Sequence, residues 1–180
     1  MRLFVALEIV SPLREAIAAL RGSLPDIRWA DPETYHLTLR FIGEVPSRPA
    51  QEDIHHALSA IHARPCPLIP EPPGLFEQNG GQGMLWVGIA RTDPLLHLQK
   101  KIDTALRRSA GVPVERRRFL PHVTIGAGPR LPDGTMSAWL AHYARTPLPT
   151  MQATRFTLFQ SLRGAGRPVY EAMAEYPFAS

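Results

Sequence analysis

Hydrophobic positions along the chain recur with two different periods, and these periods predict its strands and helices. The nearly continuous apolar stretch at residues 3–8 predicts a buried strand, and the strong alternation at residues 35–43 predicts a second strand. Apolar residues at helical spacing, between a Ser-Pro start and a glycine, predict a helix over residues 11–22. By the same criteria we expect further strands at 83–91, 119–126, 151–162 and 169–176, an edge strand with a loop at 65–73, and helices at 47–63, 93–109 and 137–143.

Glycine-containing turns are predicted between several of these elements, at residues 79–81, 133–134 and 164–166. Strands and helices follow one another without strict alternation, which favours an α+β fold with a largely antiparallel sheet. The chain has 180 residues, the size of one compact domain, and we expect residues 1–180 to form that single domain.

Composition excludes several classes of protein. Cys66 is the single cysteine, so an intramolecular disulfide framework and a cysteine-built zinc site are both excluded. Apolar runs stay far shorter than the roughly 18 residues of a transmembrane helix. Glu8 interrupts the N-terminal apolar stretch before the core of a signal peptide is complete, so we expect a cytoplasmic protein that does not contact membranes.

Charge is distributed unevenly along the chain. The formal net charge is +4, and residues 91–180 carry 13 Lys and Arg against 6 Asp and Glu. A basic half suggests a polyanionic partner or substrate, although many basic proteins bind no polyanion at all. The densest cluster is the run at residues 116–118, Arg-Arg-Arg, which on its own is typical of a solvated surface.

A four-residue pattern occurs twice, at positions separated by nearly half the chain. His36-Leu37-Thr38-Leu39 and His122-Val123-Thr124-Ile125 both read His, aliphatic, Thr, aliphatic. Each copy lies inside a predicted strand, where alternate side chains point to opposite faces. The aliphatic residues therefore face the core, and each His-Thr pair faces the opposite surface.

Two histidines that share one cleft suit acid–base chemistry near neutral pH. The ordinary imidazole pKa is about 6.5, so a neutral ring can take a proton while a protonated ring gives one. The threonine hydroxyls could hold phosphoryl oxygens between the rings. No acidic cluster accompanies either histidine, so we expect no metal. His55, His56 and His62 are interpreted as surface residues of a helix.

The alternative to a shared cleft is that His36 and His122 are two unrelated, half-buried histidines on strands, each hydrogen-bonded to its own neighbours.

With these motifs the sequence resembles the 2H phosphoesterase superfamily, and within it the RNA 2′,3′-cyclic phosphodiesterases, also called 2′–5′ RNA ligases. The resemblance extends over the whole chain. It rests on the paired motifs and on the segments at residues 2–7, 29–33, 40–43, 85–88, 118–121, 158–161 and 170.

The resemblance implies a bilobal fold with pseudo-twofold symmetry, helices on the outside and one motif in each lobe, both facing a central groove. It further implies hydrolysis of 2′,3′-cyclic phosphate at RNA 3′ ends to a 2′-phosphate, without metal or other cofactor. His36 would be the proton donor and His122 the proton acceptor, while Thr38 and Thr124 would hold the phosphate. We expect a monomer whose substrate is RNA or a nucleotide.

One departure from the family concerns an arginine. Relatives often follow the second motif with Ala-Arg, whereas here residues 126–129 read Gly-Ala-Gly-Pro before Arg130. Either Arg130 reaches back to the phosphate or the charge comes from elsewhere. Strand parity makes Arg40 one candidate, since it would share a face with His36. Arg118 is a weaker candidate because Pro121 disturbs the strand, and Tyr35 or Phe76 could stack a terminal base.

The sequence also leaves three other functions open. The same dyad would serve a 2′–5′ RNA ligase or a phosphodiesterase that acts on 2′–5′ oligonucleotides. A function of another class, an RNA-binding module without catalysis, would use the basic second half alone and would have no need of the paired histidines.

Overall fold

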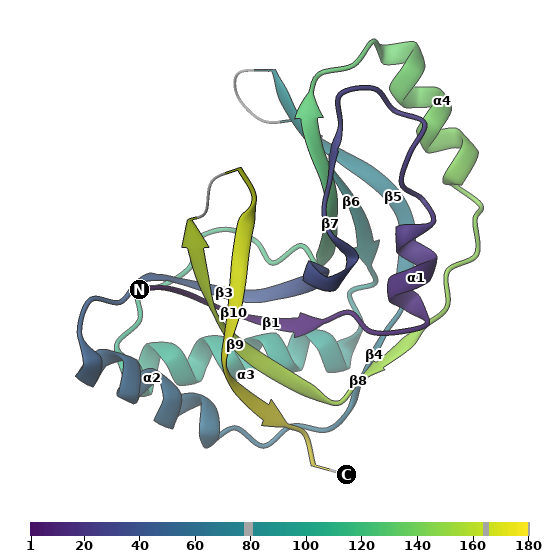
Figure 1. Cartoon of the computed structure of the whole chain (residues 1–180). Helices are drawn as coiled ribbons and strands as arrows, with labels where there is room; N and C mark the ends of the chain where they lie inside the picture. The colour runs from purple at the N-terminus through teal and green to yellow at the C-terminus, as the bar shows by residue number, and fades with distance from the viewer. Residues whose placement is uncertain (78–80, 164–165, 180) are drawn as a thin grey trace.

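A long curved antiparallel sheet forms the centre of the molecule (Figure 1). The computed structural model describes residues 1–77, 81–163 and 166–179. Its strands are β1 (Arg2–Glu8), β2 (Arg28–Trp29), β3 (His36–Glu44), β4 (Cys66–Leu68), β5 (Pro70–Glu77), β6 (Gln82–Ile89), β7 (His122–Pro129), β8 (Met151–Ala153), β9 (Arg155–Arg163) and β10 (Pro168–Pro177). Its helices are α1 (Leu13–Ala18), α2 (Arg48–Ser59), α3 (Asp93–Ala110) and α4 (Asp133–Tyr143), with a 3-10 turn at Pro32–Thr34.

The eight-stranded sheet runs in the order β10-β9-β1-β3-β7-β6-β5, and β2 pairs with β7 at the side of this path. All these pairs are antiparallel, as is the small sheet that joins β4 to β8. The predicted α+β class and the antiparallel sheet are therefore confirmed. The hairpin of β9 and β10 brings the C-terminal part of the chain back beside β1, at the opposite end of the sheet from β5.

Helices α2 and α3 lie below the β1–β3 half of the sheet, while α1 and α4 lie beside the β5–β7 half (Figure 1). In helix α3, particular residues determine where the helix begins, where it ends and which side is buried. Thr92 caps its first turn by accepting a hydrogen bond from the backbone N–H of Leu95, and Gly111 ends it in a left-handed conformation, φ 65°. Its buried stripe consists of Leu95, Leu98, Ile102 and Leu106.

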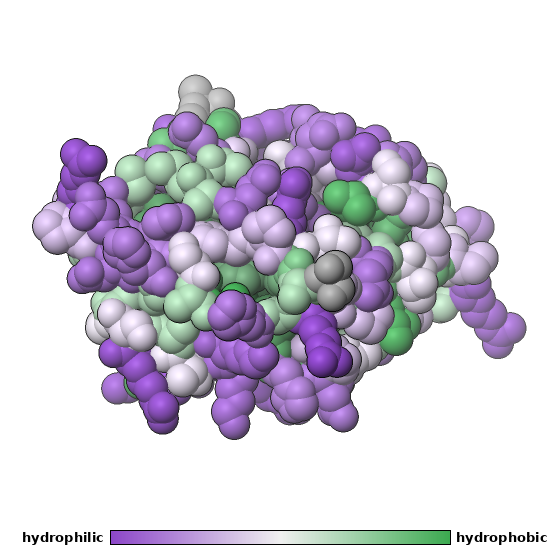
Figure 2. Space-filling model, turned by 90° about the horizontal axis from the view of Figure 1, so that it is seen from below, coloured by the Kyte–Doolittle hydropathy of each residue, from purple (hydrophilic) through white to green (hydrophobic). Residues whose placement is uncertain are grey.

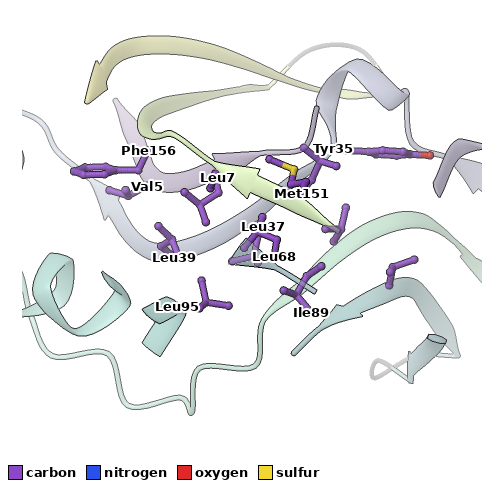
Figure 3. Packing of buried hydrophobic residues seen from close by; sticks show 14 of the residues in the cluster. Val5, Leu7, Tyr35, Leu37, Leu39, Leu68, Ile89, Leu95, Met151 and Phe156 are labelled. Carbon is purple, nitrogen blue, oxygen red and sulfur yellow. The ribbon is translucent and has the colours of Figure 1, made fainter. Parts of the chain in front are cut away.

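Aliphatic side chains from both motif strands lie in one continuous core. Leu37 and Leu39 of β3 pack there with Val5 and Leu7 of β1 and with Leu95 of α3 (Figure 3). The face seen from below carries hydrophilic side chains around its edge, with white to green, more hydrophobic patches between them (Figure 2). No helix among the described residues is long and apolar enough to cross a membrane.

Several predicted boundaries need correction. The segment at 133–134 is not a free turn but the start of α4, which therefore begins four residues earlier than predicted. The segment at 65–73 contains β4 and the first part of β5, which continues to Glu77, and the segment at 151–162 divides into β8 and β9. The turns predicted at 79–81 and 164–166 fall mostly on residues outside the described part of the chain.

Candidate active site

The two motif strands meet at one register pair in the middle of the sheet. Leu37 of β3 lies opposite Val123 of β7, and both side chains are fully buried. Side chains on either side of these residues must point to the other face of the sheet. His36, Thr38, His122 and Thr124 accordingly line one groove, whose volume is about 1140 Å³. The structure thus brings all four motif residues together.

The antiparallel register also decides which motif residues are neighbours. With Leu37 opposite Val123, His36 lies across from Thr124, and Thr38 lies across from His122. Each imidazole is therefore next to the threonine of the other motif as well as near its own. This crossed arrangement surrounds a single position in the groove with two imidazoles and two hydroxyls.

Both imidazoles are held by the same kind of hydrogen bond. The Nδ1 atom of His36 lies 2.8 Å from the carbonyl oxygen of Thr34, and the Nδ1 atom of His122 lies 2.6 Å from that of Leu120. A carbonyl oxygen only accepts, so each Nδ1 carries a proton and donates it. The other nitrogen, Nε2, is then free to take up or release the proton used in chemistry.

The surroundings of His36 are strongly aromatic. Its ring lies 5.2 Å from the ring of Phe4, 6.3 Å from that of Phe159 and 5.0 Å from that of Tyr170, which it meets edge-on. Burial among these rings lowers the pKa of His36, and the nearby His122 lowers it further, against the opposing effect of the hydrogen bond to Thr34. The neutral form of His36 is therefore favoured in the free protein.

His122 has a different aromatic support on the other side of the groove. Phe76 and Trp86 stack with ring centroids 4.9 Å apart, and both present their rings edge-on to His122, at 5.3 and 6.5 Å. Gly74 makes room for this pair, because a Cβ atom at that position would lie 2.3 Å from the indole ring of Trp86. Phe76, one of the two aromatic candidates from the sequence, thus lies at the site.

Arg40 is among the residues that line the groove with His36, although simple alternation along β3 does not place its side chain. The pairing of β1 with β3 shifts between Val5 and Ala6, which opposes Val5 to Arg40 and Ala6 to Thr38, and this bulge reverses the alternation. The Arg40 side chain lies at the groove but is buried, and its guanidinium donates to Asp103, 2.8 Å away, and to the carbonyl oxygens of Phe41 and Pro113.

This buried arginine keeps its partner ionised. Burial opposes the charge of Asp103, but hydrogen bonds from Arg40 and Arg107 outweigh that effect and hold the pKa of Asp103 below its ordinary value. Arg40 therefore connects β3 to α3 through Asp103 and to the segment after α3 through Pro113.

The remaining candidates lie elsewhere. Arg130 follows the end of β7, pairs with Asp133 at 3.4 Å and lines a separate cavity beside α4. Tyr35 is buried in the core, so it is not placed to stack a base. Arg118 is exposed and is not among the residues that line the groove.

Among the described residues, no cluster of three or more His, Cys, Asp or Glu is placed to hold a metal ion.

The groove also contains residues that sequence reasoning missed. They come from four separate segments and share either positive charge or aromatic surface: Arg2, Phe41, Arg117, Arg163, Arg167 and Tyr170. The arginine run at 116–118 gave a partial signal, although the sequence did not indicate which of its members faces the groove.

Comparison with known proteins shows which family the chain belongs to. The model of a family described as the 2′-5′ RNA ligase superfamily matches residues 9–165, most of the chain. The chain belongs to the 2′-5′ RNA ligase superfamily. Similar curated proteins in this superfamily include the RNA 2′,3′-cyclic phosphodiesterases of Thermotoga maritima, 25% identical over 99% of this chain and 96% of that protein, and Methanocaldococcus jannaschii, 26% identical over 98% and 100%.

Another RNA 2′,3′-cyclic phosphodiesterase, from Geobacillus stearothermophilus, is 28% identical over 97% of this chain, which spans 56% of that longer protein. The fold of the superfamily is equally clear in solved structures. E. coli LigT in its apo form matches with a TM-score of 0.76 at 22% identity, over 99% of this chain and 98% of that one. LigT complexed with 3′-AMP matches with a TM-score of 0.71. This protein is thus a distant relative of RNA 2′,3′-cyclic phosphodiesterases, a hydrolase family.

Proposed function

We propose that this protein hydrolyses the 2′,3′-cyclic phosphate at RNA 3′ ends to a 2′-phosphate, without a metal ion. The observation that carries the proposal is the facing pair of imidazoles, His36 and His122, each with Nδ1 fixed as a donor and Nε2 free. The names of the curated relatives support the reaction, and the LigT complex with 3′-AMP supports a nucleotide substrate.

The reaction in this proposal is one displacement at phosphorus. His122 Nε2 takes a proton from water, and the water oxygen forms a bond to phosphorus while the bond from phosphorus to the 3′ oxygen breaks. Protonated His36 gives its Nε2 proton to the departing 3′ oxygen, which leaves a 3′ hydroxyl and a 2′-phosphate. The hydroxyls of Thr38 and Thr124 donate to the two non-bridging oxygens and stabilise their charge.

The donor role of His36 requires substrate. Burial favours its neutral form in the free protein, but a phosphate anion bound between the rings favours the charged imidazolium. Substrate binding would therefore raise the pKa of His36 and supply the protonated form at the moment it is needed.

The first experiment uses nucleoside 2′,3′-cyclic phosphates in the presence of EDTA, with products identified by phosphorus NMR. We expect a 2′-phosphate as the product. His36→Ala and His122→Ala should each lower kcat by about 10²–10⁴-fold, the range of a general acid or base. His56→Ala, which removes an exposed histidine of α2, serves as the control. Strict dependence on metal, or RNA binding without turnover, would contradict the proposal.

A second experiment tests the assignment of the two roles. In an analogue with sulfur in place of the 3′ oxygen, the leaving group is a thiolate, whose conjugate acid has a pKa of about 8.5 and needs little protonation. His36→Ala should then lose much less activity than it does on the natural substrate, while His122→Ala stays impaired. The reverse pattern would exchange the two roles. Formation of 2′–5′ linkages with an added 5′-hydroxyl RNA would instead support the ligase.

A further inference from the structure

A large apolar side chain lies exposed inside a groove that is otherwise rich in charge. Phe41 belongs to β3, three residues beyond Thr38, and is 50% exposed although it lines the groove. Three residues of extended strand span at most about 10 Å, so the ring lies close to the phosphate position but outside it. An exposed aromatic face is the usual surface on which proteins stack an unpaired RNA base.

An arginine covers one side of this ring. The guanidinium of Arg117 lies 5.9 Å from the centroid of the Phe41 ring. Its segment is fixed to the motif strand, because Arg40, next to Phe41 in β3, donates to the carbonyl oxygen of Pro113. Glu115 also pairs with Arg117, at 3.5 Å, and accepts a hydrogen bond from the Arg117 backbone N–H. The Arg117 guanidinium thus lies over the Phe41 ring in the free protein.

The charge of the groove exceeds what a mononucleotide needs. Arg2, Arg163 and Arg167 line it, and none of them has an ion-pair partner in the part of the chain that the structure describes. Glu115 is the one acidic residue among the lining residues described. A terminal cyclic phosphate carries a single negative charge, and the two histidines and two threonines of the motifs already bind it in the proposed reaction. The additional arginines match the phosphodiester groups of a longer strand.

We propose that Phe41 and Arg117 form a subsite for the base that precedes the terminal nucleotide, and that Arg2, Arg163 and Arg167 contact the RNA backbone beside it. The preferred substrate is then the end of a single-stranded RNA rather than a free nucleoside cyclic phosphate. This inference rests on the proposed function, because it extends the same groove.

The test compares cytidine 2′,3′-cyclic phosphate with a tetranucleotide that ends in the same group. We expect kcat/KM to be at least about tenfold higher on the tetranucleotide, since stacking and phosphate contacts both add to binding. Phe41→Ala and Arg117→Ala should each remove most of that preference, mainly through KM. Added salt should also weaken the tetranucleotide reaction more steeply than the mononucleotide reaction.

Three controls keep the outcome clear. Phe41→Tyr keeps the ring and should retain the preference. Arg48→Ala removes one positive charge from α2, where the side chain is 88% exposed, and should leave the preference unchanged. Thermal melting shows that each variant is folded. Equal kcat/KM on both substrates, or a preference that survives Phe41→Ala and Arg117→Ala, overturns this inference alone, whereas failure to hydrolyse either substrate overturns the proposed function.

Discussion

Leu37 and Val123 lie opposite each other where β3 meets β7, and this pairing places the two His-x-Thr motifs face to face. The residues that share the groove come from positions separated by nearly half the chain. Because an antiparallel register relates the two strands by a local twofold axis, each histidine meets the threonine of the other motif. The site is therefore assembled by the contact between the two halves of the sheet.

The threonine hydroxyls can be removed with little change of shape. Thr38→Val and Thr124→Val should each lower kcat/KM by about 10- to 100-fold, because a charge-assisted hydrogen bond to a phosphate oxygen is lost. Steady-state kinetics on a cyclic phosphate measures the effect, with Thr154→Val, an exposed position between β8 and β9, as the matched control. Full activity in both motif variants would show that neither hydroxyl contacts the phosphate.

The pKa of His36 should be lowered because its side chain is buried. The pKa of this histidine in the folded protein is lowered from its ordinary 6.5, mainly by desolvation. NMR of the ring protons should therefore give a midpoint below 6.5, and added inorganic phosphate should raise it. Phe159→Ala, which removes one of the neighbouring rings, should also move the midpoint back towards 6.5. A midpoint at or above 6.5 in the free protein would contradict this.

The same shift links stability to pH. The unfolded chain binds a proton at His36 more tightly than the folded protein does, so folding is favoured while this histidine is neutral. Its contribution to the free energy of unfolding is complete above about pH 6.5 and is lost as the pH falls from 6.5 towards the lowered pKa. Urea titrations at several pH values should show this loss in the wild type and a weaker loss in His36→Gln.

Arg40→Met should destabilise the protein because it leaves the Asp103 carboxylate without its nearest partner. The substitution removes the closest partner of Asp103, a carboxylate that is 23% exposed. An uncompensated charge of this kind costs about 3 kcal/mol, with Arg107 still in place to limit the loss. Urea unfolding measures the effect. For comparison, Arg155→Ala breaks two solvent-accessible pairs, with Glu175 and with Glu8, and should cost less than about 1 kcal/mol. Equal losses in the two variants would show that burial of Arg40 adds nothing.

Gly74→Ala tests whether Trp86 holds His122 in position. The new methyl group would collide with the indole of Trp86, which must then move away from its position beside His122. We expect a loss of about 1–3 kcal/mol in stability, together with a lower kcat and a changed tryptophan fluorescence spectrum. Gly134→Ala, where nothing lies within 4 Å of the new methyl group, should be neutral or slightly stabilising. An unchanged spectrum and kcat in Gly74→Ala would contradict the prediction that Trp86 supports His122.

Local patterns in the sequence were enough to predict the faces of both motifs and most of the strands and helices. Each histidine shares a strand face with the threonine of its own motif because period-two alternation is a property of each strand alone, whereas the pairing of β3 with β7 brings the two faces to one groove. The burial of Arg40 was not predicted because the direction of its side chain depends on a bulge, and that bulge arises from the pairing of β3 with β1. Phe41 and Arg117 were missed as a pair for a related reason, since only the folded chain brings them together.

The order of the strands has a consequence for the growing chain on the ribosome. β9 and β10 lie beside β1, so Phe159 and Tyr170, which enclose His36, are supplied by segments that are synthesised after both motifs. A nascent chain can carry both histidine motifs while the aromatic enclosure of the first one is still missing. Formation of the β9–β10 hairpin is therefore the step of biosynthesis that completes the aromatic environment of His36.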